Sequence, residues 1–520
     1  MPLPLWIPLA IAVEGAPPVA IGAAELPDVG AWDRVRVDVP GWEGAEATSA
    51  HGSMLLAPPP AGTPWRVEEA PVPDGYFAQE AVDALAAAPW REGASRLAEG
   101  GASGGAGVRV AVFDVQWFGA ESLRDELGDA QTHDCQAHPS CDLPMDTFRP
   151  RYSFEEGSHG VACAETIHDL APEAELHLVR VNGLTTFESA VDWAVRNEID
   201  VVSMSMSFFN NSFHDGNGSM NTAAERLRDG GVLLVNSAGN YATEHWDGPY
   251  ADTDGDGAMD FPWGTRFFPV RWGPGTKSLM VSWDQFGFCG RTDLDVTVYD
   301  AAGAIVGRAE RRQVAGDDDC SPVERASVSS AEEGWYYMEI RLVRGDPGTH
   351  LAIFARDGDA WQTTPGSLAD PASSAASFTV GAVRAVEYLG NRAESFSSIG
   401  PSHAGIPKPD IAGPDGLSTA TYGTYGFYGT SASTPAVAGA VALLLGAEPE
   451  QSPLEAAERL RDTASRGTGA WRAEATAWAE PDGSLGAGYA RLPSPSGACG
   501  GSGIAAAAPF LLLFRRRSLR

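Results

Sequence analysis

The chain has 520 residues, of which 43% are hydrophobic, and it contains 60 glycines and 37 prolines. This composition predicts a globular, loop-rich protein of two or three domains and excludes a disordered chain. The formal net charge of −33 argues against nucleic acid as a partner, because phosphate binding requires clusters of Lys and Arg.

The N-terminal segment, residues 1–24, is predicted to be a secretory signal peptide. Its apolar run from Leu3 to Val13 is too short to span a bilayer, and small residues follow up to Ala24. A basic start is missing, so an internal start is the alternative. Residues 25–100 then form an N-terminal extension, which is either a cleaved propeptide or a segment retained in the mature protein. Helical spacing is seen within it, from Phe77 to Ala88.

A carboxylate and an imidazole stand at the ends of a predicted strand and a predicted helix. Val108 to Asp114 forms a run of β-branched and aromatic residues that predicts a buried strand ending in a carboxylate. His159 stands at the start of a predicted helix of small residues. We interpret Asp114 as an acid and His159 as a base.

Cysteines lie between these two groups and further along the chain. The chain has six, and export together with close spacing predicts two local disulfides, Cys135 with Cys141 and Cys289 with Cys320. A zinc site that uses the nearby His133 and His138 is the alternative at the first pair, although the spacing matches no standard pattern. Cys163 and Cys499 remain, and Cys163 follows His159 by one helical turn, so the two side chains are expected on one face.

Two further strands end in polar residues. The segment from Ile199 to Phe208 is predicted to be a buried strand that ends in Ser205, Met206 and Ser207. The segment from Gly230 to Asn240 is predicted to be a strand running into a tight turn of small residues. We interpret the Asn240 amide as an oxyanion donor.

An acidic loop follows at residues 252–260. Asp252, Asp254, Asp256 and Asp260 occupy positions 1, 3, 5 and 9 of a calcium-loop pattern, with Gly257 at position 6. Position 12 is Trp263 instead of Glu, so the bidentate ligand is missing. A structural Ca²⁺ site and a solvated acidic loop are both open at this stage.

Residues 265–364 are expected to form an inserted β-sandwich. Four segments there alternate or run apolar between Gly and Asp turns, namely 279–283, 294–299, 335–340 and 351–354. This insert contributes no candidate reacting group, so its expected role is stability or substrate docking.

The segment around Ser431 is the centre of the prediction. Pro435 is tolerated only near the start of a helix, so the small, apolar run that follows predicts a buried helix beginning near Ser431. At a helix N-terminus, unpaired N–H groups and the helix dipole stabilise an oxyanion. Ser431 is therefore a candidate nucleophile, and a plain N-cap serine is the alternative.

Taken in order, Asp114, His159, Asn240 and Ser431 lie in four local motifs, which read VAVxD, HGxxxA, SAGN and GTSxxxP. In this order they resemble the subtilases, the subtilisin-like serine peptidases. The resemblance covers roughly residues 101–264 and 365–490, and the expected peptidase core comprises residues 101–264 and 365–492. It implies an α/β fold, a three-layer parallel sheet with helices on both faces, with the β-sandwich as an addition.

The resemblance also implies chemistry. Asp114, His159 and Ser431 would form a catalytic triad with Asn240 as oxyanion donor, and no cofactor would be required. Protein or peptide substrates would bind at Ser205, Met206, Ser207 and Gly239. Two departures stand out: Val115 and Gln116 replace the usual small residues after the acid, and Ala432-Ser433-Thr434 departs from the usual serine motif.

The C-terminal segment, residues 493–520, resembles a bacterial surface-sorting tail of the MYXO-CTERM type. It contains Cys499-Gly500, a short apolar run and terminal arginines. The expected function is thus a secreted or surface-displayed serine endopeptidase, with the membrane as a partner only through this tail. An inert subtilase-fold surface protein that binds partners through its β-insert is the alternative.

Overall fold

A computed structural model describes residues 35–38, 66–69, 78–91, 104–147, 157–209, 212–315, 320–345, 347–360, 362–467 and 483–493. The signal peptide and the tail after residue 493 lie outside these residues.

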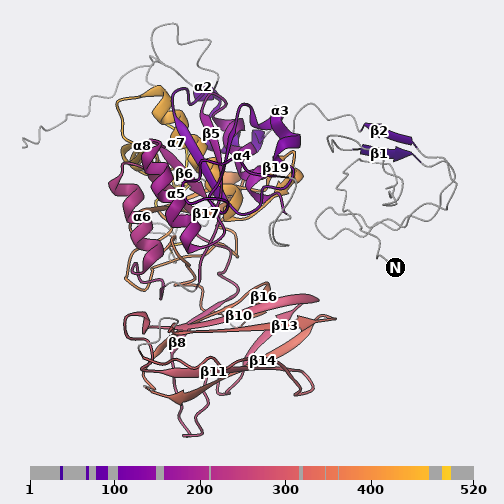
Figure 1. Cartoon of the computed structure of the whole chain (residues 1–520), viewed down its shortest axis with the longest axis vertical. Helices are drawn as coiled ribbons and strands as arrows, with labels where there is room; N and C mark the ends of the chain where they lie inside the picture. The colour runs from indigo at the N-terminus through magenta and orange to yellow at the C-terminus, as the bar shows by residue number, and fades with distance from the viewer. Residues whose placement is uncertain are drawn as a thin grey trace, which may run out of the picture.

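A seven-stranded parallel sheet forms the centre of the helix-covered core, which is the upper part of Figure 1. Its strand order is β18-β17-β7-β6-β3-β5-β4, and every neighbouring pair is parallel. The strands are β3 (Arg109–Asp114), β4 (Gln131–Asp134), β5 (Glu175–Arg180), β6 (Val201–Met204), β7 (Leu233–Ser237), β17 (Ser377–Arg384) and β18 (Ile411–Asp415). The expected α/β fold is confirmed.

Helices cover both faces of this sheet because alternate strand residues point to opposite sides. On β3, Val110 and Val112 belong to the apolar cluster of α4 and α7, whereas Ala111 and Phe113 belong to that of α5 and α6. These four helices are α4 (His159–Leu170), α5 (Leu184–Arg196), α6 (Ser219–Asp229) and α7 (Thr430–Ala447). Smaller elements of the core are α3 (Arg124–Leu127), α8 (Pro453–Asp462), β19 (Leu417–Thr419) and β20 (Gly423–Phe427).

Helix α7 is apolar on all sides. Among the described residues it alone is long and apolar enough to cross a membrane, but 89% of it is buried in the protein, as expected for a central core helix. The sequence placed Pro435 in the first turn, whereas the helix begins at Thr430 and Pro435 lies inside it. The Ser431 carbonyl therefore lacks the N–H donor that a residue other than Pro would offer at position 435.

A β-sandwich joins this core (Figure 1). Its antiparallel sheets have the orders β13-β10-β15-β8 and β12-β11-β14-β9-β16 and enclose one apolar cluster. The strands are β8 (His245–Pro249), β9 (Phe268–Trp272), β10 (Gly275–Trp283), β11 (Asp293–Asp300), β12 (Ile305–Ala309), β13 (Val323–Ser330), β14 (Gly334–Arg344), β15 (His350–Ala355) and β16 (Gly358–Ala360). The sheets thus begin at His245, earlier than the sequence suggested, and a Cys289–Cys320 disulfide lies within this region.

Part of the N-terminal extension packs on the core. Strands β1 (Val35–Asp38) and β2 (Arg66–Glu69) pair with each other. Helices α1 (Gln79–Leu85) and α2 (Ala88–Arg91) follow, and Ala81 and Leu85 are fully buried in the cluster that contains α4 and α7. The backbone N–H of Ala78 also donates to Asp169 on α4, at 2.8 Å.

Candidate active site

Asp114 is fixed at the carboxyl end of β3. It is only 1% exposed, and its Oδ1 accepts hydrogen bonds from the N–H groups of Val115 and Gln116, at 2.7 and 2.9 Å. Backbone groups of the two unusual residues after Asp114 therefore orient the carboxylate. The other oxygen, Oδ2, lies 2.7 Å from Nδ1 of His159.

His159 is the first residue of α4. The helix can approach β3 closely because Gly160 lacks a side chain: a Cβ there would lie 2.7 Å from Cβ of Asp114. Burial lowers the pKa of His159, but the adjacent Asp114 carboxylate outweighs it, so the net pKa is raised above 6.5. With Nδ1 turned to Asp114, Nε2 is the ring nitrogen left for chemistry.

Cys163 lies one turn after His159. Its Sγ and ligand atoms of Asp114 and His159 lie within 4.8 Å of one another, which confirms the expected shared face. The residue is buried and, among the described cysteines, is the one outside a disulfide. Burial, followed by the Asp114 charge, raises the pKa of its thiol well above 9.0, so it is a neutral thiol and a poor nucleophile.

Ser431 is the second residue of α7. From Gly429 to Gly446 every residue is buried except Ser431, which is partly exposed. Its carbonyl, freed by Pro435, accepts hydrogen bonds from Ser205 Oγ at 3.1 Å and from Cys163 Sγ at 3.7 Å. The start of α7 is thus tied to the helix that carries His159 and to the end of β6.

Asn240 is oriented by the residue before Ser431. Its Oδ1 accepts hydrogen bonds from both N–H and Oγ1 of Thr430, each at 3.0 Å. Because both Thr430 groups donate, the atom that they contact is the amide oxygen, and the other amide atom is Nδ2. Nδ2 makes no hydrogen bond within the described part of the chain. A Cβ on Gly429 would lie 2.9 Å from Nδ2, and Gly429 also has a φ of 99°, so both sterics and backbone require glycine there.

Two of the four expected substrate residues, Ser205 and Gly239, contact the start of α7. Strand β6 ends at Met204, and Ser205, Met206 and Ser207 are half-buried beyond it. Gly239 donates its N–H to Thr430 Oγ1 at 3.2 Å. The structure thus brings Ser205 and Gly239 into contact with the start of α7, and Met206 and Ser207 follow Ser205 in the chain.

Two buried carboxyls near the site were missed by sequence reasoning. Glu165 on α4 accepts hydrogen bonds from the N–H groups of Ala420 and Thr421 and from the Thr421 hydroxyl. Asp415 at the end of β18 accepts one from Gly429 N–H at 3.0 Å. Burial raises the pKa of each to about 7. No local motif marks them, because their partners are defined only by the fold.

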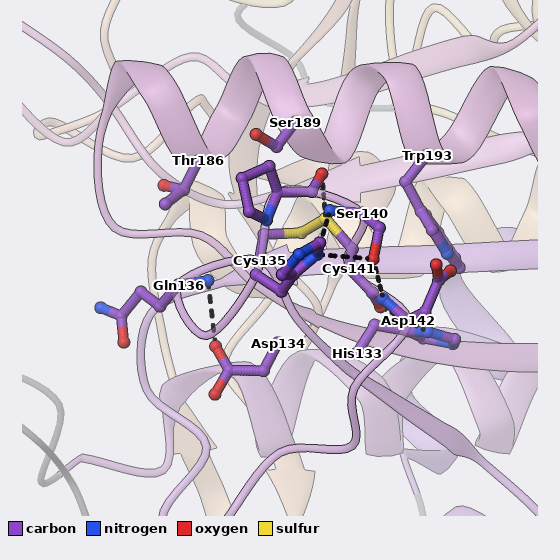
Figure 2. The surroundings of a disulfide bond; sticks show 12 residues. His133, Asp134, Cys135, Gln136, Ser140, Cys141, Asp142, Thr186, Ser189 and Trp193 are labelled. Atoms are coloured by element: carbon purple, nitrogen blue, oxygen red, sulfur yellow. Dashed lines mark hydrogen bonds between the residues drawn. A yellow bond between two sulfur atoms is a disulfide. The ribbon is translucent and has the colours of Figure 1, made fainter.

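The alternative zinc site in the loop after β4 is not supported. Cys135 and Cys141 form a disulfide beneath α5 (Figure 2). His133 points to other groups, with Nδ1 3.2 Å from the Cys141 carbonyl and Nε2 3.1 Å from His177. His138 hydrogen-bonds Ser140 instead.

The acidic loop fits the calcium pattern in part. Carboxylate oxygens of Asp252, Asp254 and Asp260 lie within 4.8 Å of one another. Asp256 differs from the expectation: its carboxylate pairs with Arg266 at 2.9 Å, so it is outside this group.

Comparison with known proteins agrees with this architecture. Residues 151–259 and 349–488 match the Subtilase family. The chain is 24% identical over 403 residues to the minor extracellular protease Vpr of Bacillus subtilis, covering 69% of this chain and 48% of that protein. It is 38% identical over 114 residues to subtilisin NAT of Bacillus subtilis subsp. natto, covering 22% of this chain and 28% of that protein. The matches therefore span less than half of either relative.

The fold has solved counterparts. The CspB protease of Clostridium perfringens superposes with a TM-score of 0.52 at 15% identity, covering 79% of this chain and 97% of that one. The chain is thus similar to the subtilases over the matched residues of its core, and the solved structure agrees with it in fold.

Proposed function

We propose that this chain is an exported serine endopeptidase that uses Asp114, His159 and Ser431 as a triad and Asn240 as oxyanion donor. The observation that carries the proposal is the 2.7 Å contact between Asp114 Oδ2 and His159 Nδ1, with Asp114 Oδ1 held by two backbone N–H groups. A carboxylate held in this way fixes one tautomer of the imidazole and stabilises its cation.

The proposed reaction begins at Ser431. His159 Nε2 removes the hydroxyl proton as Oγ attacks the carbonyl carbon of a peptide bond, and the same nitrogen then protonates the leaving amine. Asn240 Nδ2 and the Ser431 N–H donate hydrogen bonds to the oxyanion. The acyl-enzyme is hydrolysed by water in a second round of the same steps. No cofactor takes part.

Substrate binding is proposed at Ser205, Met206 and Ser207 and at Gly239. The first three residues follow β6 directly and are half-buried, and their backbone groups are proposed to pair with an extended peptide. Binding as an added strand would depend on the peptide backbone more than on its side chains.

Export is supported by two disulfides, Cys135–Cys141 and Cys289–Cys320, since such bonds persist in oxidising compartments. The relative named an extracellular protease agrees with it. We further propose that Asp252, Asp254 and Asp260 hold one structural Ca²⁺, with carboxylate oxygens as its hard ligands. The C-terminal tail is proposed to sort the protein to the cell surface.

Labelling with a fluorophosphonate probe tests the proposal. The wild-type protein should become labelled at Ser431, whereas Ser431→Ala should not be labelled and His159→Ala should be labelled far more slowly. A casein digest analysed by mass spectrometry would then give the cleavage preference. A folded protein that neither reacts with the probe nor cleaves casein would favour the inert binding protein.

A further inference from the structure

Three side chains of types that can bind metal ions converge where the β-sandwich meets the core. Asp247 on β8 and His350 on β15 belong to the sandwich, and His403 lies between β17 and β18 of the core. One ligand atom from each lies within 4.8 Å of the other two. His350 Nε2 is 2.7 Å from Asp247 Oδ1, and His403 Nε2 is 2.5 Å from Asp247 Oδ2.

The His403 ring is held in one orientation by its other nitrogen. Nδ1 faces the Phe213 carbonyl, which only accepts hydrogen bonds, so Nδ1 carries a proton. The ring also stacks on Phe213, with centroids 4.1 Å apart. In the neutral imidazole, Nε2 then presents a lone pair to the Asp247 carboxylate. This contact requires a cation or a second ring proton between the two groups.

His245 shows the same arrangement beside the cluster. Its Nδ1 lies 2.8 Å from the Thr363 carbonyl, while its buried Nε2 has no hydrogen-bond partner among the described residues. The His245 and His403 rings both lie beside Gly366. A Cβ on Gly366 would be 3.7 Å from His245 Cε1 and 3.9 Å from His403 Nε2. His245 is fully buried, and its Nδ1 contact with a carbonyl, which only accepts, leaves the lone pair of the neutral ring on Nε2.

We propose that Asp247, His350 and His403 bind one divalent transition-metal ion of the Zn²⁺ class, with the buried His245 beside this group. Imidazole nitrogens with one carboxylate suit Zn²⁺, and metal-binding histidines usually donate their second N–H to a carbonyl, as His403 and His245 do here. In a tetrahedral site with ligand bonds of about 2.0–2.1 Å, the donor atoms lie roughly 3.3 Å apart. The two histidine nitrogens now lie 2.7 and 2.5 Å from the Asp247 oxygens, so these atoms need to move apart only slightly to admit the ion.

The site has an entry route and a structural consequence. The His350 side chain is 38% exposed and the His403 side chain 14%, so ions reach the cluster from the His350 side. Because two ligands come from the sandwich and one from the core, a bound ion joins the two parts. The ion stabilises the folded state by mass action.

Metal binding to the full chain tests the proposal. The parent carries Ser431→Ala against autolysis and Cys163→Ala, because the Cys163 thiol near His159 also binds soft metals. Zn²⁺ content is measured after loading and dialysis, and Co²⁺ is titrated by its visible absorption, both in excess Ca²⁺ to saturate oxygen-ligand sites. The parent should retain one Zn²⁺ per chain.

Asp247→Asn and His350→Ala should each lower the affinity at least tenfold. The matched control His138→Ala removes an exposed histidine whose described partner is Ser140, and it should bind like the parent. Zn²⁺ should also raise the melting temperature of the parent and of His138→Ala, but not of the other two variants. A parent without Zn²⁺, or variants that bind as tightly as the parent, would overturn the site. The readouts do not involve proteolysis, so this result is separate from the proposed activity.

Discussion

Thr430 donates two hydrogen bonds to the Asn240 amide oxygen, from its N–H and its hydroxyl, each at 3.0 Å. The residue next to the proposed nucleophile therefore fixes the orientation of the proposed oxyanion donor. The Thr430 hydroxyl also accepts a hydrogen bond from Gly239 N–H. Position 430 thus links the turn after β7 with the start of α7.

This link predicts graded losses of catalytic rate. Asn240→Ala removes the donor and should lower kcat roughly 10²- to 10³-fold with a small change in KM. Thr430→Val keeps the shape but removes the hydroxyl, so Asn240 becomes less well oriented and kcat should fall by a smaller factor. Thr430→Ser, which keeps the hydroxyl, is the matched control and should stay close to wild type. An Asn240→Ala enzyme with an unchanged kcat would remove this residue from the mechanism.

The pH dependence of the reaction should report the environment of His159. The Asp114 carboxylate raises the pKa of the imidazole above 6.5, and only the neutral imidazole accepts the Ser431 proton. Activity should therefore be low at acidic pH and should rise as His159 loses its proton. We expect kcat/KM, measured from pH 5 to 10 on a peptide substrate, to have its rising midpoint above 6.5. A midpoint below that value would contradict the pairing with Asp114.

Much of this site was predictable from sequence because its parts are local. A buried strand that ends in Asp114 and a helix that begins at His159 can each be recognised from one short segment. Parallel strands place their carboxyl ends at one edge of a sheet, so groups at these ends are expected to meet there.

The parts that were missed depend on contacts between distant segments. Glu165 and Thr421 are separated by 256 positions, and neither belongs to a motif. Strand β8 was missed for another reason: His245–Pro249 contains Gly and Pro and lacks an apolar alternation, so only its pairing with β15 makes it a strand.

Glu165 should make stability depend on pH. Burial raises its pKa from 4.5 to about 7, so the native state keeps this proton over a range where the unfolded state has lost it. The stabilisation is present below about pH 4.5 and is lost as the pH rises to about 7, by roughly 1.4 kcal/mol per pH unit at most.

Glu165→Gln cannot ionise, so the stability of this variant relative to its parent should rise between pH 5 and 8. Urea unfolding in the Ser431→Ala background measures this difference. Glu225→Gln, which changes an exposed residue of α6, is the control and should show no trend. A Glu165→Gln difference that stays constant with pH would mean that Glu165 is ionised in the folded protein.

Calcium should stabilise the acidic loop. Adding Ca²⁺ to chelator-treated, dialysed Ser431→Ala protein should raise its melting temperature by a few degrees, since an ion bound only to the native state stabilises it. Asp254→Asn should abolish the shift, because Asp254 belongs to the group of three carboxylates. Asp129→Asn, at an exposed position outside the loop, should leave it intact. Equal melting curves with and without Ca²⁺ would discard the site.

Cys163 should make the proposed peptidase activity sensitive to mercury compounds. Its Sγ lies within 4.8 Å of ligand atoms of Asp114 and His159, so a mercury atom bound there would displace the imidazole from Asp114. Because Cys163 is only 1% exposed, inhibition should develop slowly. Activity followed over time with a mercurial, with mass spectrometry of the thiol, measures this effect.

Two substitutions separate the two roles of the Cys163 thiol, as a mercury ligand and as a hydrogen-bond donor. Cys163→Ser removes the mercury ligand but keeps a donor for the Ser431 carbonyl, which accepts from Sγ at 3.7 Å in the structure. This variant should resist mercury and keep most of its activity. Cys163→Ala should also resist mercury, but its kcat should fall further because the donor is lost. If the wild-type enzyme stays fully active with mercury demonstrably bound to Cys163, the thiol does not act on His159 and the spacing between these two groups is wrong.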